Sequence, residues 1–194
     1  MIVMVTGGAR SGKSTFAEKL APHLADRGVY IATSQTWDEE MKERVSLHQQ
    51  RRERGSFAWQ TIEEPIELST VLMQLEQRYR GQPEPPVILV DCMTLWLSNW
   101  LLQDTTDTDT TVQDALQDMM KQLSVMSLSV ILVTNEVGDG IVPAYPLGRQ
   151  FRDWAGWMNQ EIALNSEKVF RVTAGLAVEL KRLAVDLDQE NGWT

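Results

Sequence analysis

One run of eight residues restricts this chain more than any other feature. It extends from Gly7 to Ser14, reads Gly-Gly-Ala-Arg-Ser-Gly-Lys-Ser, and follows the short apolar run Ile2–Thr6. Glycines at such a turn let backbone N–H groups point at phosphate oxygens, and the positive end of a following helix faces the same anion. The spacing G-x-x-x-x-G-K-[ST] therefore predicts a P-loop, in which Lys13 reaches the β- and γ-phosphates of a nucleotide and Ser14 ligates Mg²⁺.

Apolar strands alternate with helical segments along the rest of the chain. The hydrophobic periodicity predicts strands at Ile2–Thr6, Val29–Thr33, Trp59–Ile62, Val87–Val90, Ser129–Thr134 and Lys168–Thr173, of which the last is expected to be the last strand of the core. It predicts helices at Lys13–Arg27, Asp38–Arg54, Pro65–Tyr79, Met93–Leu102, Val112–Leu128 and Leu147–Asn165. This alternation predicts a single α/β domain over residues 1–194, a RecA-like P-loop NTPase fold with a mostly parallel sheet and helices on both faces.

Composition and charge narrow the partners of the chain. The net charge of −9 argues against broad binding to nucleic acid or to anionic membranes. No apolar run approaches the roughly 20 residues that span a bilayer, so no membrane insertion is expected. The N-terminus enters the first strand directly and does not resemble a signal peptide. The single cysteine, Cys92, allows no internal disulfide, which favours a cytoplasmic location.

Polar residues follow two of the expected buried strands. Asp91 comes directly after Val87–Val90, where a P-loop fold places a carboxylate for Mg²⁺. Cys92 follows it where motor ATPases often carry a glutamate, which favours phosphoryl transfer to an organic acceptor over a motor. Asn135 and Glu136 end the strand Ser129–Thr134, so they are placed to touch a ligand, although a polar strand-to-loop transition explains them equally well.

One histidine lies in a strongly charged segment. At helical spacing, Arg44, His48, Arg51 and Arg52 share one face, and arginines around an imidazole suit the handling of phosphate. A neutral histidine nitrogen can also attack phosphorus. However, acidic residues at the start of a helix and basic ones at its end also complement the helix dipole. The spacing alone favours this second, purely structural interpretation.

Several motifs together resemble one known family, the bifunctional adenosylcobinamide kinase and adenosylcobinamide-phosphate guanylyltransferase of cobalamin biosynthesis. The resemblance covers Met1 to about Gly175 and rests most specifically on the P-loop octet and the later Asn-Glu-Val-Gly run at Asn135–Gly138. Further matching motifs are Tyr30–Ser34, Asp38–Met41, Arg44-Val45, His48, Trp59, Thr61, Glu63, Val90–Thr94, Ile141–Pro143, Arg149, Phe151–Asp153, Gly156 and Asn159-Gln160.

The resemblance implies a two-step reaction and a set of site residues. A nucleoside triphosphate, ATP or GTP, would phosphorylate adenosylcobinamide with the help of Lys13 and Mg²⁺, the latter held by Ser14 and Asp91. His48 would then take GMP from GTP as a covalent phosphoramidate and pass it to adenosylcobinamide phosphate. The nucleotide contacts that the resemblance implies are Gly7, Gly8, Ala9, Arg10, Ser11, Gly12, Lys13, Ser14, Ala32, Thr33, Ser34, Gln49, Gln50, Arg51, Arg52, Glu63 and Asp91.

Some questions stay open in the sequence. The resemblance implies a homo-oligomer, with a trimer as one form. No residue stands out as the general base of the kinase step, and Glu136 is one candidate. Two other functions fit the P-loop: a small-molecule kinase in which His48 is structural, and a nucleotide-dependent switch or assembly ATPase with a protein partner. The tail beyond Gly175 receives no assignment.

Overall fold

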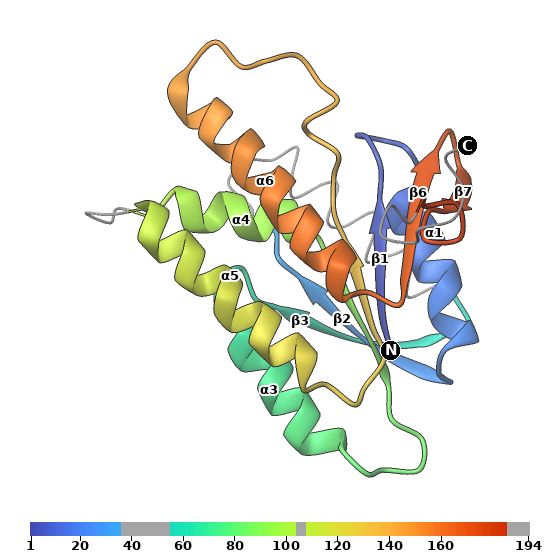
Figure 1. Cartoon of the computed structure of the whole chain (residues 1–194). Coiled ribbons are helices and arrows are strands. Elements are labelled where there is room, and N and C mark those ends of the chain that lie inside the picture. Colours follow the sequence, from blue (N-terminus) through green and yellow to red (C-terminus); the bar gives the residue numbers. More distant parts are fainter. Residues whose placement is uncertain (36–54, 104–107, 186–194) are drawn as a thin grey trace.

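A seven-stranded sheet forms the centre of the protein (Figure 1). The structure is a computed structural model and describes residues 1–35, 55–103 and 108–185. The strands are β1 (Ile2–Thr6), β2 (Arg27–Ala32), β3 (Ala58–Glu63), β4 (Val87–Asp91), β5 (Val130–Val133), β6 (Lys168–Thr173) and β7 (Leu176–Glu179). The helices are α1 (Lys13–Leu20), η1 (Ala21–His23), α3 (Leu68–Tyr79), α4 (Met93–Leu101), α5 (Thr108–Ser124) and α6 (Pro146–Asn165).

The strands lie in the order β3-β2-β4-β5-β1-β6-β7, and all neighbouring pairs are parallel except β6 and β7. The strand β5 therefore lies between β1, which leads into the P-loop, and β4, which ends at Asp91. Parallel strands carry their carboxyl ends to the same edge of a sheet, so the polar residues after β1, β2, β4 and β5 meet there. The expected α/β fold with a mostly parallel sheet is confirmed.

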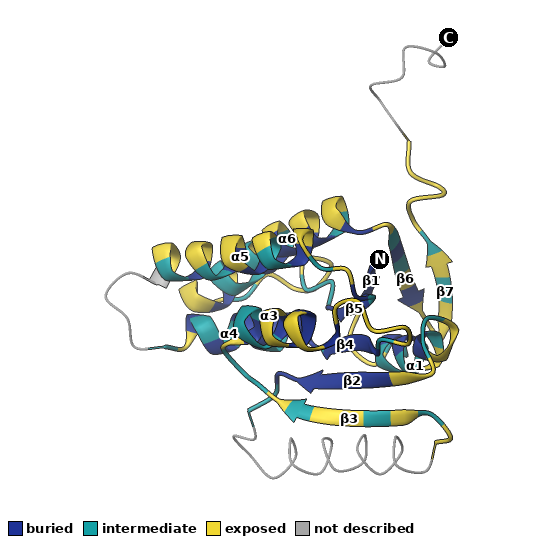
Figure 2. Ribbon diagram, turned by 90° about the horizontal axis from the view of Figure 1, so that it is seen from below, coloured by how far each residue is buried: buried dark blue, intermediate teal, exposed yellow. Residues whose placement is uncertain are grey.

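Each face of the sheet packs against helices, because alternate residues of a strand point to opposite faces. Ile2 and Met4 of β1 belong to a core shared with α3, α4, α5 and α6. Val3 and Val5 belong to a second core, which includes Ala17 of α1. Figure 2 shows α3–α6 together on one side of the sheet and the buried central strands below them. The expectation of helices on both faces is confirmed, with most of the described helices on one face.

Several boundaries differ from the expected ones. The first helix was expected to reach Arg27, but α1 ends at Leu20 and a short 3₁₀ turn follows. Pro22 lies in that turn, and a proline has no N–H to continue an α-helical ladder. The sequence predicts the last core strand at Lys168–Thr173, and the structure has β6 over these same residues. In the structure β7 follows and pairs antiparallel with β6, with Thr173 opposite Leu176.

The helix expected at Val112–Leu128 instead spans Thr108–Ser124. It ends early because the buried carboxylate of Glu76, on α3, accepts hydrogen bonds from the backbone N–H groups of Ser127 and Leu128. Those contacts hold the segment before β5 in a non-helical conformation. The segment Asp38–Arg54, expected to be helical, lies outside the described residues. Within the described part of the chain, no helix is long and apolar enough to cross a membrane.

Candidate nucleotide site

The turn between β1 and α1 has the backbone shape that the glycine pattern predicts. Gly12 has a φ of 95° and directly precedes α1, and Gly7 has a φ of 154°. A Cβ atom on Gly7 would lie 2.4 Å from the carbonyl oxygen of Val172 in β6, so no larger residue fits there without a backbone shift. The P-loop is therefore packed directly against strand β6.

The hairpin of β6 and β7 also supports the P-loop. The N–H of Gly175, between these strands, donates a 2.8 Å hydrogen bond to the carbonyl oxygen of Ser11. A Cβ atom on Gly12 would lie 3.3 Å from the Cα of Gly175. No pattern in the sequence predicts this contact, because it joins segments more than 160 residues apart. The chain beyond β6 thus has a structural role beside the nucleotide site.

Lys13 is the first residue of α1 and is only 8% exposed. Its Nζ donates a 3.0 Å hydrogen bond to the carbonyl oxygen of Gly8, which bends the side chain back over its own loop. An ammonium group held beside a glycine-rich loop at the start of a helix favours a bound polyphosphate. The position of Lys13 therefore fits the phosphate-binding role that the P-loop pattern predicts.

Asp91 ends β4 at the same edge of the sheet. Its Oδ2 accepts a 2.9 Å hydrogen bond from the hydroxyl of Tyr30, which comes from β2. The neighbouring Thr33 is fully buried, and its hydroxyl donates to the carbonyl oxygen of Cys92 at 2.7 Å. Asn99 of α4 donates to the carbonyl oxygen of Thr33 at 2.8 Å. These bonds fix the ends of β2 and β4 relative to each other and orient the Asp91 carboxylate.

A cavity of about 680 Å³ lies beside the P-loop at this edge. Eight residues expected from the sequence line it: Gly8, Ala9, Arg10, Lys13, Ser14, Ala32, Ser34 and Asp91. Asn135 and Glu136, the polar residues after β5, line it as well. The volume lies in the range of small-molecule sites. The structure thus brings the P-loop, Asp91 and the ends of β2 and β5 around one space.

Other expected contacts lie apart from the cavity lining. Gly7, Ser11 and Gly12 lie on the side of the loop that contacts β6 and the β6–β7 hairpin. Thr33 binds the carbonyl oxygen of Cys92 after β4. Glu63 is exposed at the end of the edge strand β3, opposite Ala32 in the register. The expected residues His48, Gln49, Gln50, Arg51 and Arg52 lie outside the described residues.

The structure adds residues to which the sequence assigned no contact: Tyr30, Cys92, Leu95, Val137, Asp139 and Gly140. Tyr30 precedes Ala32 by two positions, so its side chain shares a face of β2 with a residue that was expected in the site. This alternation of side chains along the strand could have predicted Tyr30 as a residue of the cavity lining. Burial, followed by the nearby charge of Asp91, raises the pKa of the Cys92 thiol to about 11. Cys92 is therefore a protonated thiol at neutral pH and not a nucleophile.

A hydrogen-bonded network positions the residues after β5. The amide of Asn135 donates to the hydroxyl of Thr94 at 2.6 Å. The carboxylate of Glu136 accepts hydrogen bonds from the hydroxyl of Thr6 and, at 3.4 Å, from the amide of Asn159. Asn159 lies on α6 and is only 8% exposed. The loop after β5 is thus tied to β1, α4 and α6 at once.

Ser14 and Asp91, the two residues that the sequence predicts as Mg²⁺ ligands, line the same cavity. Within residues 1–35, 55–103 and 108–185, no cluster of three or more histidine, cysteine or acidic side chains could hold a metal. A Mg²⁺ ion at a nucleotide needs no such cluster, because it keeps several waters and uses one or two protein oxygens together with the phosphates.

Comparisons with known proteins agree with this geometry. The family model described as cobinamide kinase / cobinamide phosphate guanyltransferase matches residues 3–180. A Pseudomonas aeruginosa protein named bifunctional adenosylcobalamin biosynthesis protein CobP is 40% identical over 92% of this chain and 96% of its own length. An Escherichia coli K12 protein named bifunctional adenosylcobalamin biosynthesis protein CobU is 36% identical over 93% of this chain and all of its own length.

Two solved structures with a similar fold are ATPases. The ATPase EscN of the type III secretion system of enteropathogenic E. coli superposes with a TM-score of 0.56 at 13% identity, over 92% of this chain and 47% of its own. A prototypical ATPase from the type III secretion system of pathogenic bacteria gives a TM-score of 0.55 at 12% identity, over 96% of this chain and 59% of its own. At such low identity these matches show a common P-loop ATPase fold alone.

Proposed function

Because this chain belongs to the cobinamide kinase / cobinamide phosphate guanyltransferase family, it is an enzyme of cobalamin biosynthesis, and we propose how its residues divide the two reactions. The family resemblance seen in the sequence is thereby confirmed. The first reaction phosphorylates the aminopropanol hydroxyl of adenosylcobinamide with ATP or GTP. The second transfers GMP from GTP to give adenosylcobinamide-GDP. One observation carries the proposal: the P-loop lysine Lys13 and the strand-end carboxylate Asp91 line one cavity.

In the kinase reaction, the P-loop holds the triphosphate and Lys13 stabilises the charge that spreads over the transferred phosphoryl group. Ser14 and Asp91 would hold Mg²⁺, and the ion would neutralise part of the negative charge of the phosphates. The fixed bonds of Asp91 to Tyr30 and of the P-loop to the β6–β7 hairpin keep these groups in place before the substrates bind. Such preorganisation lowers the cost of reaching the transition state.

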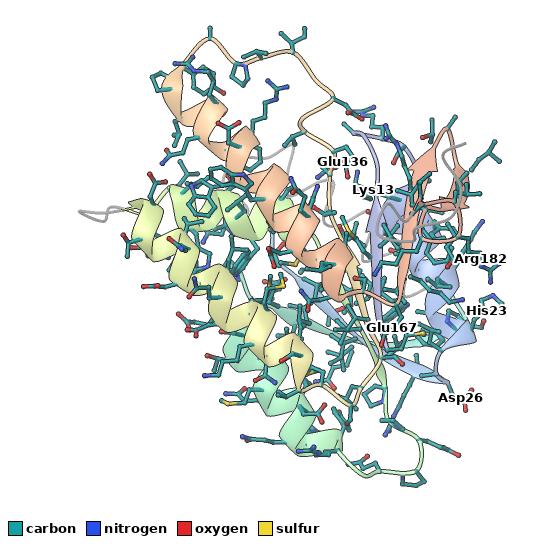
Figure 3. The ribbon with its side chains drawn as sticks, in the orientation of Figure 1. Lys13, His23, Asp26, Glu136, Glu167 and Arg182 are labelled. Atoms are coloured by element: carbon teal, nitrogen blue, oxygen red, sulfur yellow. The ribbon has the colours of Figure 1, made fainter. Side chains whose placement is uncertain are left out.

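In the guanylyltransferase reaction, a histidine nitrogen attacks the α-phosphorus of GTP, pyrophosphate leaves, and the phosphoramidate then passes GMP to cobinamide phosphate. The chain has two histidines, His23 and His48. His23 is exposed at the end of the 3₁₀ turn after α1, ten residues beyond Lys13, or about 15 Å along a helical path. Figure 3 shows it at the far end of α1, away from Lys13 and Glu136. Its location supports His48 as the nucleophile.

We also propose that the enzyme is a homo-oligomer, with a trimer as one form. The helix α6 exposes apolar side chains along one side, among them Trp157 at 56% and Leu164 at 75% exposure. Exposed apolar patches often mark protein–protein contacts. Light scattering coupled to gel filtration measures the mass of the assembly. A monomer at all micromolar concentrations would contradict this part of the proposal.

The test of the function uses GTP labelled at the α-phosphate, incubated with the purified enzyme and Mg²⁺. We expect label on the protein that is stable in alkali and lost in acid, as for a phosphoramidate. The variant His48→Ala should carry no label, whereas the matched control His23→Ala should be labelled like the wild type. GTP labelled at the γ-phosphate should leave the protein unlabelled. A second assay follows phosphate transfer from γ-labelled ATP to adenosylcobinamide.

The outcomes separate the alternatives. A folded protein that binds GTP but gives no α-label would refute His48 as nucleophile and leave a plain kinase. A protein that neither takes α-label nor phosphorylates adenosylcobinamide would point to a nucleotide-dependent switch instead.

A further inference from the structure

We propose that Glu136 is the general base of the kinase step, accepting the proton of the cobinamide hydroxyl as that oxygen attacks the γ-phosphorus. This inference rests on the proposed function. In the step, a bond forms between the hydroxyl oxygen and the γ-phosphorus. The bond from that phosphorus to the β–γ bridging oxygen breaks, and the nucleoside diphosphate leaves with the bonding electrons. The hydroxyl proton passes to the Glu136 carboxylate, which returns it to solvent after the product leaves.

The position of Glu136 is fixed relative to the P-loop. It follows β5 by three residues, and its backbone N–H donates a 3.3 Å hydrogen bond to the carbonyl oxygen of Gly7. Its side chain is held to β1 by Thr6, whose hydroxyl donates to Oε1. The carboxylate thus lies beside the loop that holds the triphosphate, and Figure 3 shows Glu136 and Lys13 at the same end of the sheet.

The network around Glu136 also orients its carboxylate. Thr134 donates its hydroxyl to Oδ1 of the buried Asn159 at 2.7 Å, which fixes the amide so that its Nδ2 faces Glu136. The bonds from Thr6 and Asn159 both end on Oε1. The other oxygen, Oε2, is therefore the one that would accept the proton of the cobinamide hydroxyl. Both neighbours donate to the carboxylate, so the network holds it as a hydrogen-bond acceptor, which is the form that a base requires.

The other candidates in the cavity suit the role less well. Three carboxylates from the described residues line it: Asp91, Glu136 and Asp139. Asp91 accepts the Tyr30 hydroxyl and stands where Mg²⁺ is expected. Asp139 is 61% exposed and forms a 2.6 Å ion pair with Arg171. The Cys92 thiol, with its pKa raised to about 11 by burial, holds its own proton at neutral pH.

A base is needed in only one of the two reactions. The hydroxyl of adenosylcobinamide must lose a proton when it is phosphorylated. A neutral histidine attacks GTP through a free nitrogen, and cobinamide phosphate is already an anion when it takes up GMP. Glu136 should therefore matter for the kinase step and not for the guanylyltransferase step. Such a separation is not expected of a residue that only supports the fold.

The test compares Glu136→Gln with the wild type in both half-reactions. We expect kcat for phosphate transfer from γ-labelled ATP to adenosylcobinamide to fall by roughly 10²–10⁴-fold, the usual contribution of a general base. The KM for ATP should change by less than about threefold, because a carboxylate makes no favourable contact with the anionic triphosphate. Glu136→Asp should restore part of the rate.

The second half-reaction checks that the variant is folded. Label from α-labelled GTP and its transfer to supplied adenosylcobinamide phosphate should stay within about threefold of the wild type. The control Glu161→Gln, an exposed carboxylate on α6, should leave both half-reactions unchanged. Kinase activity within about tenfold of the wild type in Glu136→Gln would overturn the proposal. So would an equal loss of both half-reactions with a higher Mg²⁺ requirement, which would make Glu136 a metal-binding or structural residue. A wild-type enzyme that phosphorylates no adenosylcobinamide would overturn the proposed function and this role with it.

Discussion

Alanine substitutions at two glycines of the P-loop test whether the loop is packed against strand β6. In Gly7→Ala the new methyl group would lie 2.4 Å from the carbonyl oxygen of Val172, and the backbone of Gly7 has a positive φ of 154°. The carbonyl belongs to strand β6 and cannot rotate away as a flexible side chain would. Overpacking costs about 1–3 kcal/mol and an unfavourable positive φ about 1–2 kcal/mol, so we expect Gly7→Ala to lose about 2–5 kcal/mol of unfolding free energy.

Gly8→Ala is the matched control, since a Cβ atom on Gly8 meets nothing within 4 Å. Its unfolding free energy should stay within about 0.5 kcal/mol of the wild type. Urea unfolding followed by tryptophan fluorescence measures both variants without nucleotide, and Gly7→Ala should lower the midpoint by about 1–2 M. Equal midpoints for the two variants would refute the idea that the loop is packed against β6.

Two further predictions concern buried groups. Glu76→Ala should lose about 2–4 kcal/mol of unfolding free energy, because it leaves the N–H groups of Ser127 and Leu128 without their acceptor. Glu76→Gln should lose about half as much. The exposed neighbour is the control, and Gln77→Ala should lose almost nothing. Urea titrations rank the three, and equal stability of all of them would contradict the role of the carboxylate. The pKa of the Cys92 thiol rises from 9.0 to about 11 on folding. As the pH is raised, the unfolded chain therefore loses this proton before the folded chain does, which favours unfolding. The unfolding free energy should fall by about 1 kcal/mol between about pH 8 and pH 10. This fall in unfolding free energy should be smaller in Cys92→Ala. The same pH dependence in that variant as in the wild type would contradict the raised pKa of Cys92.

Much of the fold followed from local patterns. The strands β1 and β4 are fully apolar up to their last residue, and buried parallel strands are the structures in which such runs occur. The glycines of the P-loop predicted a turn that only glycine-rich sequence adopts. Helix ends were less accurate, because the segment that ends α5 is held by Glu76, a residue 51 positions away in the chain from Ser127. Periodicity within one segment carries no information about such a contact.

Part of the cavity lining could be predicted from the sequence. Lys13, Ser14 and Asp91 could be placed because each stands at a position that the nucleotide fold defines. Tyr30 was missed, since a tyrosine within an apolar strand is typical of a core. The role of His48 was not decided by its spacing and depends on the family resemblance; it stays a prediction, as does the metal site.

The sequence by itself determined the identity of the chemical groups and the phosphate-binding turn, because a P-loop is a local structure set by adjacent residues and their backbone preferences. Only the tertiary structure decided which groups share a cavity. The pairing of β5 between β1 and β4 places Glu136 beside the P-loop, and the hairpin of β6 and β7 brings Gly175 against Ser11. These contacts join segments that lie far apart in the chain, and their geometry comes from the order of strands in the sheet, which no short segment of sequence encodes.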